Sequence, residues 1–258
     1  MAKCLLLIVP CYNEEFRLPV GKFAEFIESH LDYDFCFVND GSTDKTRDML
    51  HDLAKDAKNK YVVECPENLG KAEAIRFAIN TSLKKKSYDF VGYWDADLST
   101  PLEEIHDFLR VYEKFPTLSM VIGSRVKLMG RRITRKLYRH YFGRVFATAV
   151  SVMLNLPVYD IQCGAKIIRS DLANKIFLQP FITPWFFDVE LIFRTILLMG
   201  KEEAEKAIYE LSLKTWEDIG GSKLKISDFL KTPYYLFKIF LHFQMRRWQH
   251  KPSYEDCP

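Results

Sequence analysis

The chain has 258 residues, 48% of them apolar and 28% charged, and a net charge of +3. This composition is typical of a soluble globular protein with one large core or two small ones, and it excludes a disordered chain. No apolar run approaches the ~18–20 residues that span a bilayer, and no secretory signal precedes the first apolar run. We therefore expect a cytoplasmic protein, and the small net charge gives no reason to expect nucleic acid as a partner.

The first half alternates short apolar runs with amphipathic helical patterns. We expect strands over residues 4–9, 34–38, 61–64, 89–94 and 119–123, with helices between them. Strands joined by helical crossovers predict an α/β fold with a mostly parallel, doubly wound sheet flanked by helices. Such sheets bind ligands beyond the carboxyl ends of their strands.

The second half is less regular. We expect a basic helix over 131–155, a short element over 165–169, a helix over 187–199, a strand over 208–213 and an amphipathic helix over 226–248. This pattern predicts one domain over residues 1–224, with a C-terminal amphipathic helix and tail over 225–258.

Carboxylates follow two of the expected strands. Asp95 and Asp97 end the fourth strand, and unpaired charge there would be costly unless a divalent cation joined it to a diphosphate. Asp40 ends the second strand before Gly41, where it can accept hydrogen bonds from a ribose or a base, although a turn and helix cap also explain the local pattern. Lys71 opens the third helix, where a cation suits a phosphate or a base, and a surface lysine is the alternative.

Five motifs in this order resemble the inverting family 2 glycosyltransferases, whose fold is the GT-A type: VPCYNEE (9–15), NDGSTD (39–44), NLGK (68–71), DAD (95–97) and GSR (123–125). Three later segments narrow the resemblance to the polyprenyl-phosphate sugar transferases, and most closely to the dolichyl-phosphate β-glucosyltransferase type: DIQCGAK (160–166), WFFDVE (185–190) and GSKL (221–224). The resemblance covers residues 5–224, with a nucleotide-sugar half over about 1–125 and an acceptor half over about 126–224.

The resemblance implies a role for each matching residue. The nucleotide-sugar is expected on Pro10, Tyr12, Glu14, Asp40, Lys71, Asp95 and Asp97. The metal, Mg²⁺ or Mn²⁺, is expected on Asp95 and Asp97, with Asp97 the direct ligand. Phosphate contacts are expected from Arg125 and Lys223, and sugar and acceptor contacts from Asp160, Gln162, Asp188 and Glu190.

One departure from the family concerns the residues after the aspartate pair. Mannosyl-type relatives follow it with Leu-Gln-His-Pro, whereas this chain has Leu98-Ser99-Thr100-Pro101. The substitution of Ser99 for the glutamine weakens the mannosyl alternative and a third protein ligand for the metal. It favours glucose from UDP-glucose as the donor sugar.

A stretch without acids follows Arg125. Residues 126–159 contain no Asp or Glu but seven basic residues, among which Arg131 and Arg135 are expected to meet the acceptor phosphate. Aromatic residues at helical spacing indicate an interfacial helix and peripheral contact with the cytoplasmic face of a membrane. A buried helix with a solvated basic edge is the alternative.

The acceptor decides what chemistry the carboxylates must perform. A polyprenyl phosphate is already anionic and needs little general-base help, whereas a glycan or other hydroxyl acceptor would need a base such as Asp160 or Asp188. We expect a lipid phosphate, and Arg125, Asp97, Asp160 and Asp188 as the catalytic set. A hydroxyl acceptor, a catalytically idle membrane-surface protein and a homo-oligomer are left open.

Overall fold

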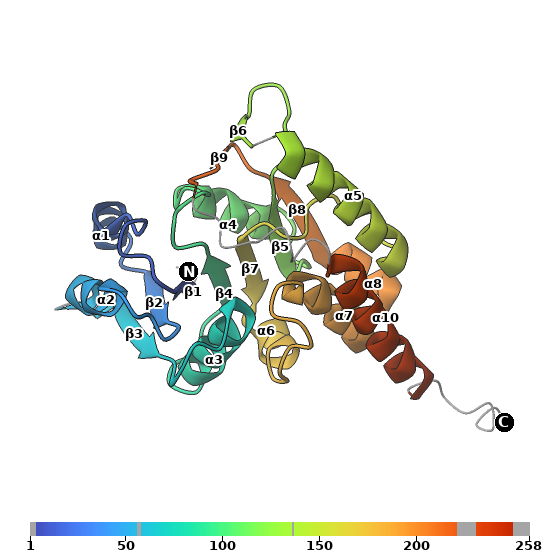
Figure 1. Cartoon of the computed structure of the whole chain (residues 1–258), viewed down its shortest axis with the longest axis horizontal. Coiled ribbons are helices and arrows are strands. Elements are labelled where there is room, and N and C mark those ends of the chain that lie inside the picture. The colour runs from blue at the N-terminus through green and yellow to red at the C-terminus, as the bar shows by residue number, and fades with distance from the viewer. Residues whose placement is uncertain (1–3, 56–57, 136, 221–230, 250–258) are drawn as a thin grey trace.

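The computed structural model describes residues 4–55, 58–135, 137–220 and 231–249 (Figure 1). The first half contains β1 (Leu5–Cys11), α1 (Val20–Ser29), β2 (Tyr33–Asn39), α2 (Thr46–Ala54), β3 (Lys60–Glu64), α3 (Lys71–Leu83), β4 (Phe90–Trp94), α4 (Glu104–Lys114) and β5 (Met120–Ser124). The second half contains β6 (Arg132–Thr134), α5 (Leu137–Leu154), β7 (Ala165–Arg169), α6 (Ser170–Ile176), α7 (Phe187–Met199), α8 (Lys201–Ala207), β8 (Ile208–Ser212), β9 (Thr215–Glu217) and α10 (Thr232–Gln249).

The central sheet has seven strands in the order β3-β2-β1-β4-β7-β5-β8. All neighbours pair in parallel except β7, which runs antiparallel between β4 and β5. The prediction of a mostly parallel, doubly wound sheet is confirmed. The chain builds β2 and β3 on one side of β1 and then places β4 on the other, so the strand order reverses at the β1–β4 pair, where such sheets form their ligand crevice.

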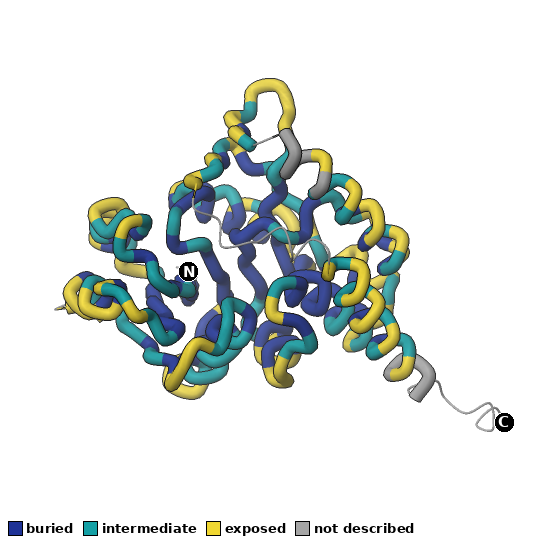
Figure 2. Tube along the Cα trace, viewed as in Figure 1, coloured by how far each residue is buried: buried dark blue, intermediate teal, exposed yellow. Residues whose placement is uncertain are grey.

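Alternating side chains of each strand enter two separate cores. Leu6 and Ile8 of β1 lie in the core beneath α3, α6 and α7, whereas Leu5, Leu7 and Val9 lie in the core beneath α1, α2 and α4. Figure 2 shows the strands as the most buried part of the chain, with exposed surface on the outer faces of the helices. The two cores fix the sheet rigidly, and the site is built on the carboxyl ends of its strands.

The basic helix predicted over 131–155 was wrong at its start. Residues Arg132–Thr134 form β6, which pairs in parallel with Thr215–Glu217 of β9, and the helix α5 begins at Leu137. The pairing buries Ile133 beside Trp216 in the core. Local periodicity favoured a helix here, but a strand partner about eighty residues away decided the structure.

The last predicted helix begins within residues that the structure does not describe, and α10 is described from Thr232. It packs against the rest of the chain: Ile239 and Phe243 are buried in the core, and the Phe243 ring stacks on Phe193 of α7 at 4.7 Å. Among the helices of the described ranges, none combines the length and apolar character needed to cross a membrane.

Candidate active site

The turn after β4 places the Asp95 and Asp97 carboxylates at the carboxyl ends of the parallel strands. The backbone N–H of Asp95 donates to the carbonyl of Gly164 (3.0 Å), and the N–H of Leu98 donates to the carbonyl of Asp95 (3.1 Å). Leu98 has a φ of +52°, a backbone conformation that residues other than glycine rarely adopt. Asp97 fastens the turn further by accepting the N–H of Ser99 (3.0 Å).

Each of these carboxylates carries its own cation. Nζ of Lys71 lies 2.5 Å from Oδ1 of Asp95, and Nη2 of Arg17 lies 2.5 Å from Oδ2 of Asp97. Burial, the largest single influence, would raise the pKa of Asp95, but the charge and hydrogen bond of Lys71, together with the charges of Arg125 and Lys166, hold that pKa below its usual value. Burial would likewise lower the pKa of Lys71, but Asp95 and the nearby Asp188 raise it. Both members of the Lys71–Asp95 pair are therefore charged at neutral pH.

A glycine makes room for Asp95. A Cβ atom added to Gly164 would lie 1.8 Å from Oδ2 of Asp95 and 2.1 Å from its Cγ, closer than any real contact. Gly164 belongs to the segment before β7, which pairs with β4. The Asp95 carboxylate can therefore occupy this position only because residue 164, just before β7, has no side chain.

The nucleoside residues expected from the motifs gather at the ends of β1 and β2. Pro10 pairs with Val38 in the parallel ladder, which brings the ends of the two strands together. Asp40 is 2% exposed and accepts the N–H groups of Leu69 (2.7 Å) and Gly70 (3.0 Å). The Asp40 carboxylate therefore holds the turn that introduces Lys71, a structural task that the sequence had not indicated.

Tyr12 and Glu14 follow β1 on the same side of the molecule. Tyr12 is half-buried, and Glu14 is buried with its N–H donating to Oγ1 of Thr46 (2.7 Å). The structure places both residues, with Pro10 and Asp40, at the carboxyl ends of β1 and β2. Their contacts with a nucleoside stay a prediction.

Arg125, after β5, binds Asp160 through a fork. Nε and Nη2 of Arg125 donate to the two carboxylate oxygens at 2.7 Å each, and its backbone N–H donates at 2.9 Å. Glu210 of β8 accepts the N–H groups of Tyr159 (2.8 Å) and Asp160 (2.7 Å), which fixes the backbone on which the carboxylate stands. Burial would raise the pKa of Asp160, but Arg125 foremost and Arg135 in addition lower it.

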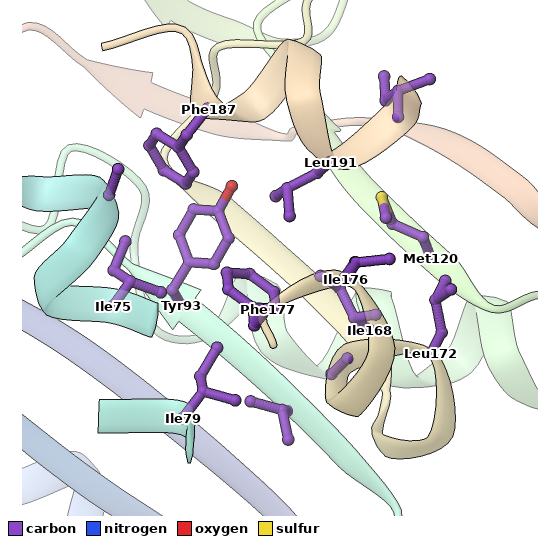
Figure 3. Close-up of a cluster of buried hydrophobic side chains, with 14 of the residues drawn as sticks. Ile75, Ile79, Tyr93, Met120, Ile168, Leu172, Ile176, Phe177, Phe187 and Leu191 are labelled. Carbon is purple, nitrogen blue, oxygen red and sulfur yellow. The ribbon is translucent and has the colours of Figure 1, made fainter. Parts of the chain in front are cut away.

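Asp188, at the start of α7, forms a buried pair with Lys166 of β7. The Lys166 side chain is fully buried, and its Nζ lies 2.6 Å from Oδ1 of Asp188 while donating to the carbonyls of Ile161 (2.7 Å) and Cys163 (2.8 Å). The hydroxyl of Tyr93 donates to the same carboxylate oxygen. In Figure 3 the Tyr93 ring lies between α3 and the start of α7, beside Phe187.

The other predicted acceptor residues have partners of their own, stand before a strand, or lie outside the described ranges. Glu190 is fully buried and accepts the N–H groups of Ile182 and Thr183 at 2.9 Å each, so it holds the loop before α7. Arg131 stands in the turn before β6 and Gln162 is half-buried before β7. Lys223 falls outside the described residues.

Sequence reasoning missed Arg17, Lys166 and Tyr93. Arg17 had one signal, a basic side chain in the loop after a strand whose end was already predicted to bind a ligand. Lys166 stood inside a quoted motif, but an alternating strand gives no sign that a lysine will be fully buried. Tyr93 looked like an ordinary core residue, and its ring is one, while its hydroxyl reaches Asp188.

The donor atoms at Asp95 and Asp97 fit Mg²⁺ or Mn²⁺ shared with a substrate. Within the described residues, no cluster of three or more histidine, cysteine or acidic side chains could hold a metal by itself. Mg²⁺ typically binds one or two carboxylates, keeps several waters and takes its remaining ligands from substrate phosphates. Two carboxylates on one turn, with Ser99 after them, match that requirement and not an all-protein metal cage.

A family model described as Glycosyl transferase family 2 matches residues 6–177. The chain belongs to glycosyl transferase family 2. It is 30% identical to the dolichyl-phosphate beta-glucosyltransferase of Drosophila melanogaster, over 95% of this chain and 77% of that protein. It is 29% identical to a dolichyl-phosphate beta-glucosyltransferase of Trichomonas vaginalis, over 95% of this chain and 75% of that protein. The resemblance of the motifs to this type of glycosyltransferase is thus confirmed.

Solved structures show the same fold. Glucosyl-3-phosphoglycerate synthase from Mycobacterium tuberculosis, in complex with Mn²⁺, UDP and glucosyl-3-phosphoglycerate, superimposes with a TM-score of 0.66, covering 93% of this chain and 80% of that chain. The two sequences are 18% identical, so the similarity establishes the GT-A fold alone.

Proposed function

We propose that this glycosyltransferase moves glucose from UDP-glucose to a polyprenyl phosphate of the dolichyl type, with inversion at the sugar carbon and with help from a divalent metal. The similarity to dolichyl-phosphate beta-glucosyltransferases over 95% of the chain supports the sugar and the acceptor. The Mn²⁺ and UDP-glucose bound to a solved structure of the same fold support the donor and the metal.

The state of the acceptor-half carboxylates carries the proposal. Asp160 is held by the fork of Arg125, and Asp188 by Lys166 and Tyr93. A carboxylate whose pKa is lowered by an adjacent guanidinium, as at Asp160, is a poor general base. A hydroxyl acceptor needs such a base, whereas a phosphate monoester is already an anion at neutral pH. The pairing therefore favours a phosphate as the nucleophile.

In the proposed reaction the acceptor phosphate oxygen attacks the anomeric carbon of glucose as the bond to UDP breaks. One new carbon–oxygen bond forms on the face opposite the leaving group, which inverts the configuration. A metal held by Asp97 and Asp95 would neutralise charge that develops on the departing diphosphate. Lys71, at the start of α3, adds a cation beside Asp95.

Direct assay tests the proposal. Purified protein supplied with UDP-glucose, Mn²⁺ and a polyprenyl phosphate in detergent should release UDP and form a glucosylated lipid. An Asp97→Asn variant should retain the wild-type Tm and lose at least about 100-fold in kcat/KM, because the oxygen proposed to bind the metal loses its charge. UDP release with phosphoglyceric acid or a free sugar but not with the lipid would refute the acceptor, and unchanged turnover in Asp97→Asn would refute the metal role.

Two helices offer a surface for the lipid. On α10, the exposed side chains at a spacing of three and four residues are Tyr234, Phe237, Leu241 and Met245. On α5, the exposed side chains Tyr141, Val145 and Val152 are four and seven residues apart, which also places them on one face. Both helices lie on the same side of the molecule (Figure 1), and Phe146 of α5 and Tyr235 of α10 contact the ring of Phe186, the residue directly before α7. Apolar stripes beside the basic segment before α5 suit the interface of an anionic membrane.

Vesicle flotation tests this membrane contact. Wild-type protein should float with vesicles that contain phosphatidylserine, and the Phe237→Ser/Leu241→Ser double variant should float several-fold less, since both side chains are exposed and their loss leaves the core unchanged. Leu31→Ser is the matched control, because Leu31 is 73% exposed but precedes β2, away from both helices. Equal flotation of the double variant and the wild type would exclude α10 as the contact surface.

A further inference from the structure

Arg17 already occupies the carboxylate that is proposed to bind the metal. Its Nη2 lies 2.5 Å from Oδ2 of Asp97, and the two side chains are 23% and 16% exposed. The other oxygen of Asp97 accepts the N–H of Ser99. Both oxygens of the aspartate therefore have a partner before any ligand arrives.

Arg17 lies beside Asp97 because the two residues follow β1 and β4, the strands between which the strand order of the sheet reverses. A tight turn after β1, in which the N–H groups of Arg17 and Leu18 both donate to the Glu14 carbonyl at 2.9 Å, fixes its backbone. β1 and β4 are paired neighbours, so the loops that follow them face each other across the proposed ligand crevice. A second contact, from Nη1 of Arg17 to Glu14 at 3.5 Å, ties the guanidinium to its own loop.

We propose that Arg17 is an electrostatic latch on Asp97, which keeps a free divalent cation out of the site and admits it together with the nucleotide. This inference rests on the proposed metal-assisted use of UDP-glucose. A divalent cation that arrives alone must displace one guanidinium and then sit beside two cations, Arg17 and Lys71. A cation that arrives with a sugar nucleotide is accompanied by the two negative charges of the diphosphate, to which the displaced guanidinium can bind. Arg17 is thus a positioning residue that makes metal and nucleotide binding depend on each other.

The size of the effect follows from a population argument. The apparent affinity for a ligand is the intrinsic affinity multiplied by the fraction of molecules whose site is open to it. A latch closed in about 90% of free molecules therefore weakens metal binding about tenfold. A charge-assisted hydrogen bond of ordinary strength is sufficient for that fraction. Because coupling between two ligands is reciprocal, Mn²⁺ must strengthen UDP binding by the same factor by which UDP strengthens Mn²⁺ binding.

The test measures Mn²⁺ binding to the full chain by electron paramagnetic resonance, with and without UDP. Arg17→Gln removes the charge and should bind Mn²⁺ about tenfold more tightly than the wild type in the absence of UDP, and UDP should strengthen that binding less than in the wild type. Arg110→Gln is the control, because Arg110 is an exposed arginine that also pairs with an aspartate, Asp107 on α4, and its loss should leave Mn²⁺ binding unchanged. Equal or weaker Mn²⁺ affinity in Arg17→Gln without UDP would overturn the latch.

A second variant covers the case in which Arg17→Gln does not fold. Arg17→Met also removes the charge and keeps an unbranched side chain, so its Mn²⁺ affinity without UDP should likewise rise about tenfold; no rise overturns the latch. Turnover of UDP-glucose is scored separately. Equal Mn²⁺ affinities with normal turnover overturn the latch alone, whereas a tenfold difference in Mn²⁺ affinity without turnover by the wild type overturns the proposed function alone.

Discussion

Gly164→Ala is the smallest change that should disable the site. The added Cβ would lie 1.8 Å from Oδ2 and 2.4 Å from Oδ1 of Asp95, and an ordinary contact begins near 3.4 Å. The carboxylate must therefore move by about 1.6 Å, because close-packed atoms cannot overlap. That displacement breaks the 2.5 Å contact with Lys71 and moves Asp95 away from the place proposed for the metal and diphosphate.

The expected loss is large for one methyl group. Misplacement of about 1 Å at a reacting centre typically costs about 100-fold, so kcat/KM for UDP-glucose should fall by at least that factor. Overpacking should lower the free energy of unfolding by about 1–3 kcal/mol, which leaves the protein folded at room temperature. The assay is UDP release together with Mn²⁺-dependent UDP binding, and Tm is measured for each variant.

Gly21→Ala is the matched control for this substitution. A Cβ atom at Gly21, in α1, would meet nothing within 4 Å, and alanine is the better helix former. This variant should keep wild-type turnover with an equal or higher Tm. Wild-type turnover in Gly164→Ala would refute the assignment of Asp95 to the donor site, because no relaxed position of the carboxylate could reproduce its present one.

Two further predictions concern buried and half-buried charge. Lys166→Met leaves Asp188 buried without its cation, which should lower the free energy of unfolding by about 3–5 kcal/mol and the Tm by roughly 10 °C. Lys206→Met, which removes one member of an exposed pair, is the control and should leave the Tm unchanged. Equal Tm values for the two variants would show that Asp188 does not need Lys166. Nε2 of His106 lies 3.1 Å from Nε2 of His30, and burial foremost, then the His30 charge, lowers the pKa of His106. The unfolded chain therefore binds the proton more readily, so this contribution to stability is complete above about pH 6.5 and declines as the pH falls toward the folded pKa. Urea unfolding at pH 7.5 and 5.0 should show a smaller loss of stability in His106→Gln than in the wild type, and an identical loss in both would refute this origin.

The parts of the fold that were predictable are those with a local signal. The strands β1, β2 and β4 are apolar runs that end in polar turns, and their helices carry clear apolar faces, so the donor half followed from pattern alone. The antiparallel direction of β7 and the β6–β9 pair did not, because both depend on partners far along the chain. A three-residue strand is too short for its period to be distinguished from the first turn of a helix.

The site divides in the same way. Asp95 and Asp97 could be predicted because a charged pair that ends a core strand has few structural explanations. Their cations could not, because the partner of Asp97 stands 80 residues earlier and a turn after β1 has no periodicity to interpret. Glu190 was predicted to meet the acceptor from its motif alone, and its burial against the loop before α7 depends on tertiary packing that no local pattern encodes.

The pairing of charges bears on how the enzyme joins two anions. Each of the four carboxylates Asp95, Asp97, Asp160 and Asp188 has a basic partner at 2.7 Å or less, so the charge of each is balanced before any ligand binds. A site of bare cations would attract either phosphate indiscriminately, and one of bare carboxylates would repel both. Under the proposed function, Asp97 would hold the metal that accompanies the donor, and Arg17 would then pair with the diphosphate. Lys166 stays fixed by burial and by its hydrogen bonds to two backbone carbonyls, and Arg125 by its fork. Asp160 and Asp188 therefore stay neutralised while the negative acceptor approaches.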